Sequence, residues 1–304
     1  MQTTDKKKDF LGRVALVLTT LIWGTSFIIM KDTLDTVPTL WLLAFRFTGA
    51  AVLMALFGVR QLKKLDRGYL KGGVVMGVFL CVAYIVQTFG LVYTTPGKNA
   101  FLTATYCVIV PFLWWFFNRK KPDRYNLSAA LICFIGMGMV SLQDDLSIGL
   151  GDALTICCGL FYALHIIATA KATEGRSPIL LSMIQFATAA VICWIAAPLS
   201  APMPRGIPAA SWYSIAYLCF MCTGVCFLLQ TVGQKYTPPS AAAVILTLES
   251  VFGTLLSILF YHEQLTLRVA VGFVLIFVAV LISETKLSFL HPKASPSGGS
   301  CHRR

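Results

Sequence analysis

The stretch QTFGLVYT at residues 87–94 returns as QTVGQKYT at residues 230–237, which is 143 positions later. Matching eight-residue windows are weak evidence by themselves, but other segments recur at nearly the same separation. Gly12 and Gly151 each open an apolar run, and they lie 139 positions apart. The sequence therefore predicts two copies of one structural unit.

The hydropathy of the chain says what this unit is made of. Of the 304 residues, 57% are hydrophobic and 12% charged, and the mean hydropathy is +0.75, which excludes an ordinary soluble domain. The charged residues are clustered, and a bilayer core needs about 20 apolar residues per helix. Ten apolar runs fit that length, namely 14–30, 36–59, 72–97, 99–118, 125–143, 153–170, 177–204, 206–234, 236–262 and 269–283.

Ten runs and two copies give five helices per copy. A unit with an odd number of helices ends on the opposite face from its start, so the second copy crosses the membrane in the opposite sense. We predict an all-α polytopic membrane protein with ten transmembrane helices arranged as two inverted five-helix repeats. The repeats are residues 1–143 and 144–286, and residues 287–304, rich in Pro, Ser and Gly, are predicted to form a disordered cytoplasmic tail.

The basic residues set the predicted orientation. When the segments between runs are assigned alternately, 20 of the 25 Lys and Arg residues fall on the side that holds both termini. The positive-inside rule makes that side the cytoplasm. The first run lacks a small-residue cleavage site, so we expect it to be retained in a multi-pass protein of the plasma membrane, in bacteria the inner membrane. The net charge of +12 then reflects topology, and no nucleic-acid partner is expected.

Several kinds of chemistry are disfavoured by the residue patterns. Cys219-x-x-Cys222 has no second Cys or His pair to close a tetrahedral site, so no metal and no cofactor are predicted. The glycines before Lys98 lack the spacing of a phosphate loop, which disfavours an ATP-driven pump. An intramembrane protease would need paired buried Asp residues or His-Glu-x-x-His, and His262-Glu263 lacks the second His. We therefore expect no enzyme.

Two charged residues lie inside predicted spans. Glu249 is the one carboxylate there, and an intramembrane acid is a candidate for proton coupling or for binding a substrate ammonium group. A structural hydrogen bond to another helix is the alternative. Arg46 is the one cation, and it could bind a substrate carboxylate, pair with a helix-end carbonyl or extend towards the surface. Lys31 closes the first run and is expected to be an interface anchor.

Aromatic and polar residues complete the candidate site. Tyr162 and His165 share a helix face with Thr169, and the 139-residue offset relates that face to Trp23, Ser26 and Met30. The two faces could be opposing sides of a cavity, although packing is the common role of such residues. The substrate-binding candidates are Trp23, Ser26, Arg46, Tyr84, Gln87, Asn99, Tyr106, Tyr162, His165 and Glu249.

Several motifs together resemble the EamA-type branch of the drug/metabolite transporter superfamily. They are WGTSFIIMK (23–31), RF (46–47), GD (151–152), TLESV (247–251) and HEQLT (262–266), the last followed by RVAVGFVLIFVAVLIS. The resemblance covers about residues 10–286. It implies a ten-helix carrier that exports, or sometimes imports, small metabolites such as amino acids without ATP. The chain departs from the family pattern in two places. Ser250 follows Glu249 where the family often has Pro, and four extra residues lie between Tyr93 and Pro111.

The sequence therefore favours a secondary transporter that moves a small amino-acid-like or amphipathic metabolite across the plasma membrane by alternating access, with export as the expected direction. Its expected partners are the substrate, the lipid bilayer and, as an open question, a coupling proton. The protein could be a monomer or a homodimer. A channel or a lipid scramblase is the alternative, because hydropathy does not reveal whether a pathway closes. A membrane-embedded enzyme is a less favoured alternative.

Overall fold

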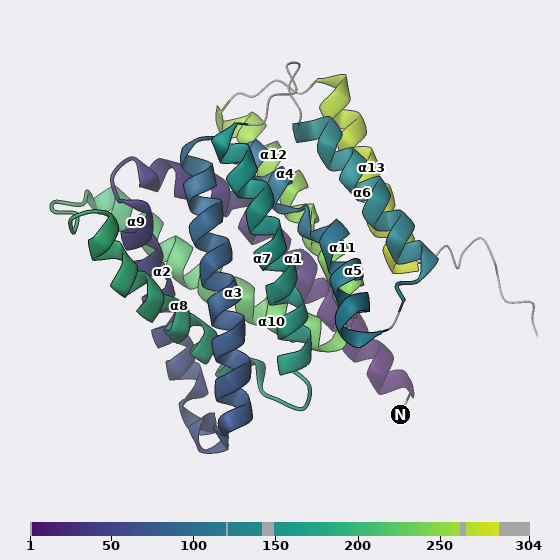
Figure 1. The fold of residues 1–304 in the computed structure, drawn as a ribbon, viewed down its shortest axis with the longest axis horizontal. Helices are drawn as coiled ribbons and strands as arrows, with labels where there is room; N and C mark the ends of the chain where they lie inside the picture. The colour runs from purple at the N-terminus through teal and green to yellow at the C-terminus, as the bar shows by residue number, and fades with distance from the viewer. Residues whose placement is uncertain (1, 120, 142–148, 262–265, 286–304) are drawn as a thin grey trace, which may run out of the picture.

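The computed structural model describes residues 2–119, 121–141, 149–261 and 266–285 (Figure 1). Within these ranges the secondary structure is helical throughout, with no strand. Eight helical segments there are long and apolar enough to cross a membrane. The all-α class is thereby confirmed, while the predicted disordered tail and the HEQL part of the HEQLT motif lie outside the described residues.

The order of the helices follows the predicted runs. The first half of the chain holds α1 (Gln2–Leu34), α2 (Thr39–Gly58), the short 3₁₀ helix η1 (Val59–Lys64), α3 (Arg67–Val92), α4 (Pro96–Thr103), α5 (Tyr106–Asn118) and α6 (Arg124–Ser141). The second half holds α7 (Leu150–Ala172), α8 (Pro178–Ser200), α9 (Ala209–Tyr217), the π-helix η2 (Leu218–Val225), α10 (Cys226–Tyr236), α11 (Pro239–Leu246), α12 (Leu248–Tyr261) and α13 (Leu267–Thr285).

Helices α6 and α13 cover the two predicted spans that are not among the eight. They pack against each other along one side of the molecule (Figure 1). In α13 the apolar segment Ala270–Ala279 is shorter than a full span within the described residues. Within the described residues eight helices thus qualify as membrane spans, and the predicted number of ten is not confirmed.

Two ends of the helix bundle are used below as reference points. The α3–α4 end carries the turn between α3 and α4 and the start of α7, and the α10–α11 end carries the turn between α10 and α11 and the start of α1 (Figure 1). At the first turn the Thr95 hydroxyl accepts a hydrogen bond from the Lys98 amide at 3.3 Å, and Pro96 occupies the first helical turn. The second copy ends α10 at Thr237, and Pro239 begins α11, so each copy of the motif ends a helix and leads into a tight turn.

Two of the predicted long helices are interrupted. The fourth run divides into α4 and α5 at Ala104 and Thr105, and the ninth divides into α11 and α12 at Thr247. Positions 104 and 247 differ by 143, so the two breaks occupy corresponding places. The second break needs no proline, because the Ser250 hydroxyl donates to the Thr247 carbonyl at 2.6 Å and satisfies part of the interrupted backbone.

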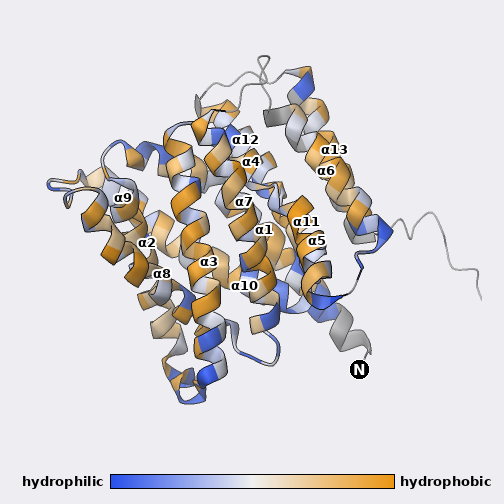
Figure 2. Ribbon diagram, viewed as in Figure 1, coloured by the Kyte–Doolittle hydropathy of each residue, from blue (hydrophilic) through white to orange (hydrophobic). Residues whose placement is uncertain are grey.

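Most of the extensive helix contacts join the first half of the chain to the second. Helix α2 packs on α8, α3 on α7, α6 on α13, and α1 on α10 and α12. Glycines permit the closest of these approaches, as where Gly73 and Gly77 of α3 lie against α8. The helices present apolar residues along most of their length, and hydrophilic residues gather at the turns (Figure 2). The core is thus shared between the two halves.

Candidate functional site

A narrow cavity lies in the middle of the bundle, between helices from both halves. Water could occupy only about 20 Å³ of it, which is room for about one molecule. The structure is therefore closed around this cavity. Its lining residues are Trp23, Ser26, Phe27, Met30, Tyr84, Gln87, Thr103, Tyr106, Tyr162, Ile166, Phe227, Gln230, Leu246 and Glu249.

The lining follows the two sequence offsets of the repeat. Twelve of the fourteen residues form pairs separated by 139 or 143 positions. At 139 the pairs are Trp23 with Tyr162 and Phe27 with Ile166, and at 143 they are Tyr84 with Phe227, Gln87 with Gln230, Thr103 with Leu246 and Tyr106 with Glu249. Corresponding positions of the two halves thus meet around one cavity.

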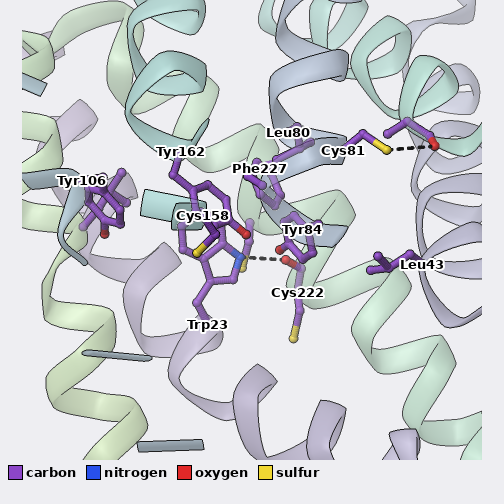
Figure 3. Packing of buried hydrophobic residues seen from close by; sticks show 14 of the residues in the cluster. Trp23, Leu43, Leu80, Cys81, Tyr84, Tyr106, Cys158, Tyr162, Cys222 and Phe227 are labelled. Atoms are coloured by element: carbon purple, nitrogen blue, oxygen red, sulfur yellow. Dashed lines mark hydrogen bonds between the residues drawn. The ribbon is translucent and has the colours of Figure 1, made fainter. Parts of the chain in front are cut away.

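Aromatic rings make up much of the lining (Figure 3). The centroids of Trp23 and Phe227 are 4.8 Å apart, and Tyr84 lies 5.8 Å from both Tyr162 and Phe227. The Trp23 indole N–H donates to the Cys222 carbonyl at 2.8 Å, which fixes the orientation of that ring (Figure 3). These rings present flat apolar surfaces to the cavity, and the partial negative charge on a ring face can attract a bound cation.

Glu249 and Tyr106 form the polar contact at the two helix breaks. Glu249 begins α12 just after the break at Thr247, and Tyr106 begins α5 just after the corresponding break. The Tyr106 hydroxyl donates to Glu249 Oε1 at 3.1 Å, and the Glu249 side chain is almost fully buried. No cation among the described residues forms an ion pair with Glu249. The acid therefore has one protein hydrogen bond and an orientation towards the cavity.

Two glutamines form the amide part of the lining. Gln87 is held on both sides, because its Oε1 accepts from the Tyr162 hydroxyl at 2.7 Å and its Nε2 donates to Thr103 Oγ1 at 2.9 Å. Its counterpart Gln230 is less restrained, since its buried Oε1 has no hydrogen-bond partner among the described residues. A free acceptor of this kind can receive a hydrogen bond from a ligand.

Arg46 lies behind the lining and does not reach the cavity in this structure. It is completely buried, and its Nε donates to Thr223 Oγ1 at 2.9 Å within the π-helix. The guanidinium also lies over the Tyr84 ring, at 4.9 Å from its centroid. Extension of Arg46 to the surface was therefore a wrong alternative, and among the described residues no hydrogen bond from Arg46 to a helix-end carbonyl is found.

His165 and Asn99 are also placed behind the lining. His165 Nε2 lies 2.9 Å from Gln185 Oε1, while its Nδ1 has no partner among the described residues. Asn99 Nδ2 donates to Thr155 Oγ1 at 2.8 Å. The predicted run 99–118 contains both Asn99 and Tyr106, but the break at residues 104–105 puts them on α4 and α5. The other seven candidates line the cavity, and whether they bind substrate stays a prediction.

Sequence reasoning missed half of the lining. The substrate-binding candidates did not include Phe27, Met30, Thr103, Ile166, Phe227, Gln230 and Leu246, although Met30 was expected on the same helix face as Trp23 and Ser26. The repeat offsets contained the signal, because Gln230 is the counterpart of Gln87, and Phe227 is the counterpart of Tyr84. Applying each offset to each candidate would have found both residues.

Above the cavity, polar contacts hold the α3–α4 end closed. The Lys98 ammonium lies 3.4 Å from Asp152 Oδ2, and the Thr94 hydroxyl donates to Asp152 Oδ1 at 2.8 Å. The Lys31 ammonium donates to three backbone carbonyls at the end of α3, the nearest being Leu91 at 2.8 Å. Lys31 therefore caps α3. The sequence predicted an interface anchor at Lys31 and did not predict this capping role.

The α10–α11 end is closed by close helix packing. A Cβ atom at Gly233 would lie 2.8 Å from the Gly12 carbonyl oxygen, so α1 and α10 touch backbone to backbone. Polar groups buried beside this contact have no hydrogen-bond partner among the described residues. They are both amide atoms of Gln234 and the hydroxyl of Thr237.

Metal coordination finds no support in the described ranges. There, no group of three or more His, Cys, Asp or Glu side chains is placed to hold a metal ion. Cys219 and Cys222 are buried as free thiols. They act as small apolar side chains against α1 and α2, since Cys219 packs on Gly49.

Comparisons with known proteins agree with the membrane architecture. The model of the EamA-like transporter family matches residues 10–142 and 149–285. A protein of Archaeoglobus fulgidus named "Uncharacterized transporter" is 31% identical over 282 residues, covering 92% of this chain and 88% of the relative. "Uncharacterized transporter YoaV" of Bacillus subtilis is 21% identical, covering 90% and 97%. A solved structure described as "Crystal structure of protein" shares the fold, with a TM-score of 0.75 and 14% identity over 94% of this chain and 99% of that chain.

Proposed function

The chain belongs to the EamA-like transporter family, and we propose that this multi-pass membrane protein is a secondary transporter that exports a small amino-acid-like or amphipathic metabolite by alternating access. The observation that carries the proposal is the central cavity lined by corresponding residues of both halves. A cavity built in this way can open to either end of the bundle by related movements, because each half supplies the same positions.

The architecture behind this proposal is the ten-span inverted repeat. We propose that α6 and α13 are the fifth and tenth spans and that the repeats comprise residues 1–143 and 144–286. The corresponding helix breaks at residues 104–105 and 247 support this arrangement. Transporters commonly place their binding sites beside interrupted helices near the middle of the membrane. In the plasma membrane the α3–α4 end would then face outward and both termini would lie in the cytoplasm.

The chemistry of the cavity favours a substrate with an ammonium group and an apolar body. Glu249 supplies the negative charge, and the rings of Trp23, Tyr84 and Tyr162 supply faces that attract cations and apolar groups. Gln230 offers a free amide oxygen for a further hydrogen bond. A substrate carboxylate would need Tyr84 or Met30 to move before it reached Arg46, because both side chains contact the guanidinium.

Glu249 is also the candidate for proton coupling. A lone acid buried in the membrane is costly when ionised, so it can carry a proton in one state and a substrate cation in another. Tyr106 is the group that would sense this exchange, since its hydroxyl donates to the carboxylate. Competition of proton and substrate for one carboxylate would couple their movements in opposite directions.

The first experiment identifies a ligand and separates a carrier from a channel. Purified protein is screened by thermal shift against amino acids, sugars, nucleosides and cationic drugs, and a stabilising compound is then tested in proteoliposomes. A carrier takes up labelled substrate faster into vesicles preloaded with the unlabelled compound. Uptake that preloading does not accelerate would indicate a channel and contradict the proposal.

The second experiment tests Glu249 directly. We expect Glu249→Gln to reduce transport at least tenfold and to remove its pH dependence, because the amide cannot exchange a proton. Glu174→Gln, at an exposed acid on the α7–α8 turn, is the control and should leave both unchanged. An unaltered pH profile in Glu249→Gln would exclude the coupling role.

A further inference from the structure

A hollow on the lipid-facing surface runs between α2, α3 and α8, away from the central cavity. It has a volume of about 680 Å³ and is lined by Ala51, Val52, Ala55, Leu70, Val74, Met183, Ile184, Ala187, Thr188, Val191 and Ile192. All of these residues except Thr188 are apolar. The small side chains of Ala51, Ala55 and Ala187 create the depth of this groove between larger neighbours.

A set of five basic residues lies at the end of this groove. We call Arg60, Lys63, Lys64, Arg67 and Lys71 the basic cluster, and all five are exposed. The cluster is close to the groove along the chain, since Arg67 and Lys71 flank the lining residue Leu70, and Arg60 follows Ala55 by five positions. Figure 2 shows the hydrophilic turn between α2 and α3 directly beyond the apolar parts of these helices.

Protein acids do not neutralise the basic cluster. No member forms an ion pair within the part of the chain that the structure describes. Asp66 lies among them, but its Oδ1 accepts from the Tyr69 amide at 2.8 Å and caps α3. Glu174 is an acid on the neighbouring α7–α8 turn, and its single negative charge is outnumbered by the five positive charges of the cluster.

The other basic segment at the same end provides a contrast. There the Lys121 ammonium lies over the Trp115 ring at 5.9 Å, and the Arg124 guanidinium lies over the Tyr125 ring at 5.1 Å. The positive-inside rule accounts for both segments as topological signals. It does not account for an apolar groove that opens beside unpaired cations at one of them.

The backbone that carries the cluster is held in place. Ser177 Oγ donates to Gln61 Oε1 at 2.6 Å, and the Ser177 amide donates to the Tyr69 hydroxyl at 2.9 Å. The α7–α8 turn therefore ties η1 to the start of α3. A charged group bound here would meet a preformed surface, which reduces the entropy cost of binding.

We propose that the groove and the basic cluster together form a binding site for one anionic phospholipid, with its phosphate on the cluster and an acyl chain along the groove. Basic pockets between membrane helices on the cytoplasmic side are suited to such headgroups. A second copy of the chain is a poorer occupant. A symmetric dimer through this face would bring like charges from the two clusters together. The inference needs the helices to cross a bilayer and does not depend on which substrate is transported.

Binding can be tested with the intact protein in detergent by titrating phosphatidylglycerol or phosphatidylcholine and measuring lipid retention by native mass spectrometry. We expect phosphatidylglycerol to be retained preferentially, and Lys63→Gln/Lys64→Gln to weaken its binding by about thirtyfold, which is about fivefold for each cation removed. Lys121→Gln/Arg124→Gln removes the same charge from the other basic segment and should retain the lipid. Equal loss in both double variants, or equal retention of phosphatidylcholine, would overturn the proposal.

The groove itself is tested by Ala55→Trp, which fills the hollow and leaves every cation in place. We expect this variant to lose phosphatidylglycerol retention, whereas Leu199→Trp, at an exposed position beyond the groove, should retain it. Glycerol phosphate alone should not compete, because it lacks the acyl chain. A wild-type dimer that Ala55→Trp converts to monomer would instead assign the groove to a second copy and overturn the proposal.

Discussion

Two glycine contacts close the two ends of the bundle, and their backbones are nearly alike. Gly90 meets Gly151 at the α3–α4 end, and Gly233 meets Gly12 at the α10–α11 end. The offsets of 143 and 139 relate Gly90 to Gly233 and Gly12 to Gly151. At each contact, a Cβ atom on one glycine would lie 2.8 Å from the carbonyl oxygen of the other. The same close approach of two helices is therefore present twice.

The side chains around the two contacts differ. At the α3–α4 end Thr155 receives a hydrogen bond from Asn99, and Asp152 pairs with Lys98. The residue that corresponds to Thr155 is the apolar Leu16, which packs on Gly233. At the other end Leu16 gives apolar packing, while Arg13, the counterpart of Asp152, pairs with Asp9 of its own helix, and the Lys235 ammonium donates to the Arg176 carbonyl at 3.0 Å.

This difference predicts that the two ends do not open with equal ease. An unpartnered buried polar group costs about 1–3 kcal/mol, and Gln234 buries both amide atoms without a partner among the described residues. Hydration of Gln234 on opening would recover that cost. At the α3–α4 end, opening would break the Lys98 ion pair and the Thr94 hydrogen bond. We therefore expect the α10–α11 end to open first from this closed structure.

The largest effect is expected from a side chain inserted into the α3–α4 contact. In Gly151→Val the Cβ would lie 2.8 Å from backbone atoms of Gly90 and Tyr93, so this end could not close. We expect transport to fall more than tenfold. The buried Cys158 thiol should also become reactive towards a membrane-impermeant maleimide in a Cys157→Ser background.

Gly149→Val is the matched control for this wedge, because no atom lies within 4 Å of its Cβ position. It should transport normally and keep Cys158 protected. Normal transport by Gly151→Val would show that closure of this end is not required.

A smaller effect is expected when the ion pair is removed but the backbone contact is kept. Asp152→Asn neutralises the partner of Lys98, in a pair whose side chains are 20% and 14% exposed. The loss of about 1 kcal/mol should raise Cys158 labelling about fivefold. Asp9→Asn, in the more exposed Asp9–Arg13 pair of α1, should leave labelling unchanged. Equal effects of the two variants would contradict the assignment of a closing role to Asp152.

The smallest effect is expected at the α10–α11 end, and it has the opposite sign. Gln234→Leu replaces two unpartnered polar atoms with an apolar group of similar size, which stabilises the closed packing. The midpoint of thermal unfolding should rise by a few degrees, and transport should slow about twofold because this end opens less readily. A lower midpoint would show that Gln234 makes a favourable interaction and would remove the proposed asymmetry.

The sequence allowed the helical class and the repeat to be predicted because both depend on long, regular patterns. Apolar runs mark the helices, and two constant offsets mark the corresponding positions. Glu249 could be selected because an acid is rare in such a run, and the structure places it on the cavity.

The remaining parts of the site depend on contacts between distant segments. Arg46 has the charge needed to bind a substrate carboxylate, but the packing of Met30 and Tyr84 places it behind the cavity lining. The break at residues 104–105 has no proline or glycine that would mark it, so the sequence did not predict that Asn99 and Tyr106 lie on different helices. The hydrogen bond between Tyr106 and Glu249 joins two halves that local patterns treat separately.

The packing of α2 on α8, of α3 on α7 and of α1 on α10 also has a consequence for biosynthesis. The first half leaves the ribosome before the helices that cover it have been made. Its interior faces, including Arg46 and Gln87, remain uncovered in the bilayer until the second half, with Gln230 and Glu249, has been synthesised and inserted. Insertion and folding are therefore separate events for this chain. A truncation after α6 should give an inserted but unfolded product, which cellular quality control would degrade.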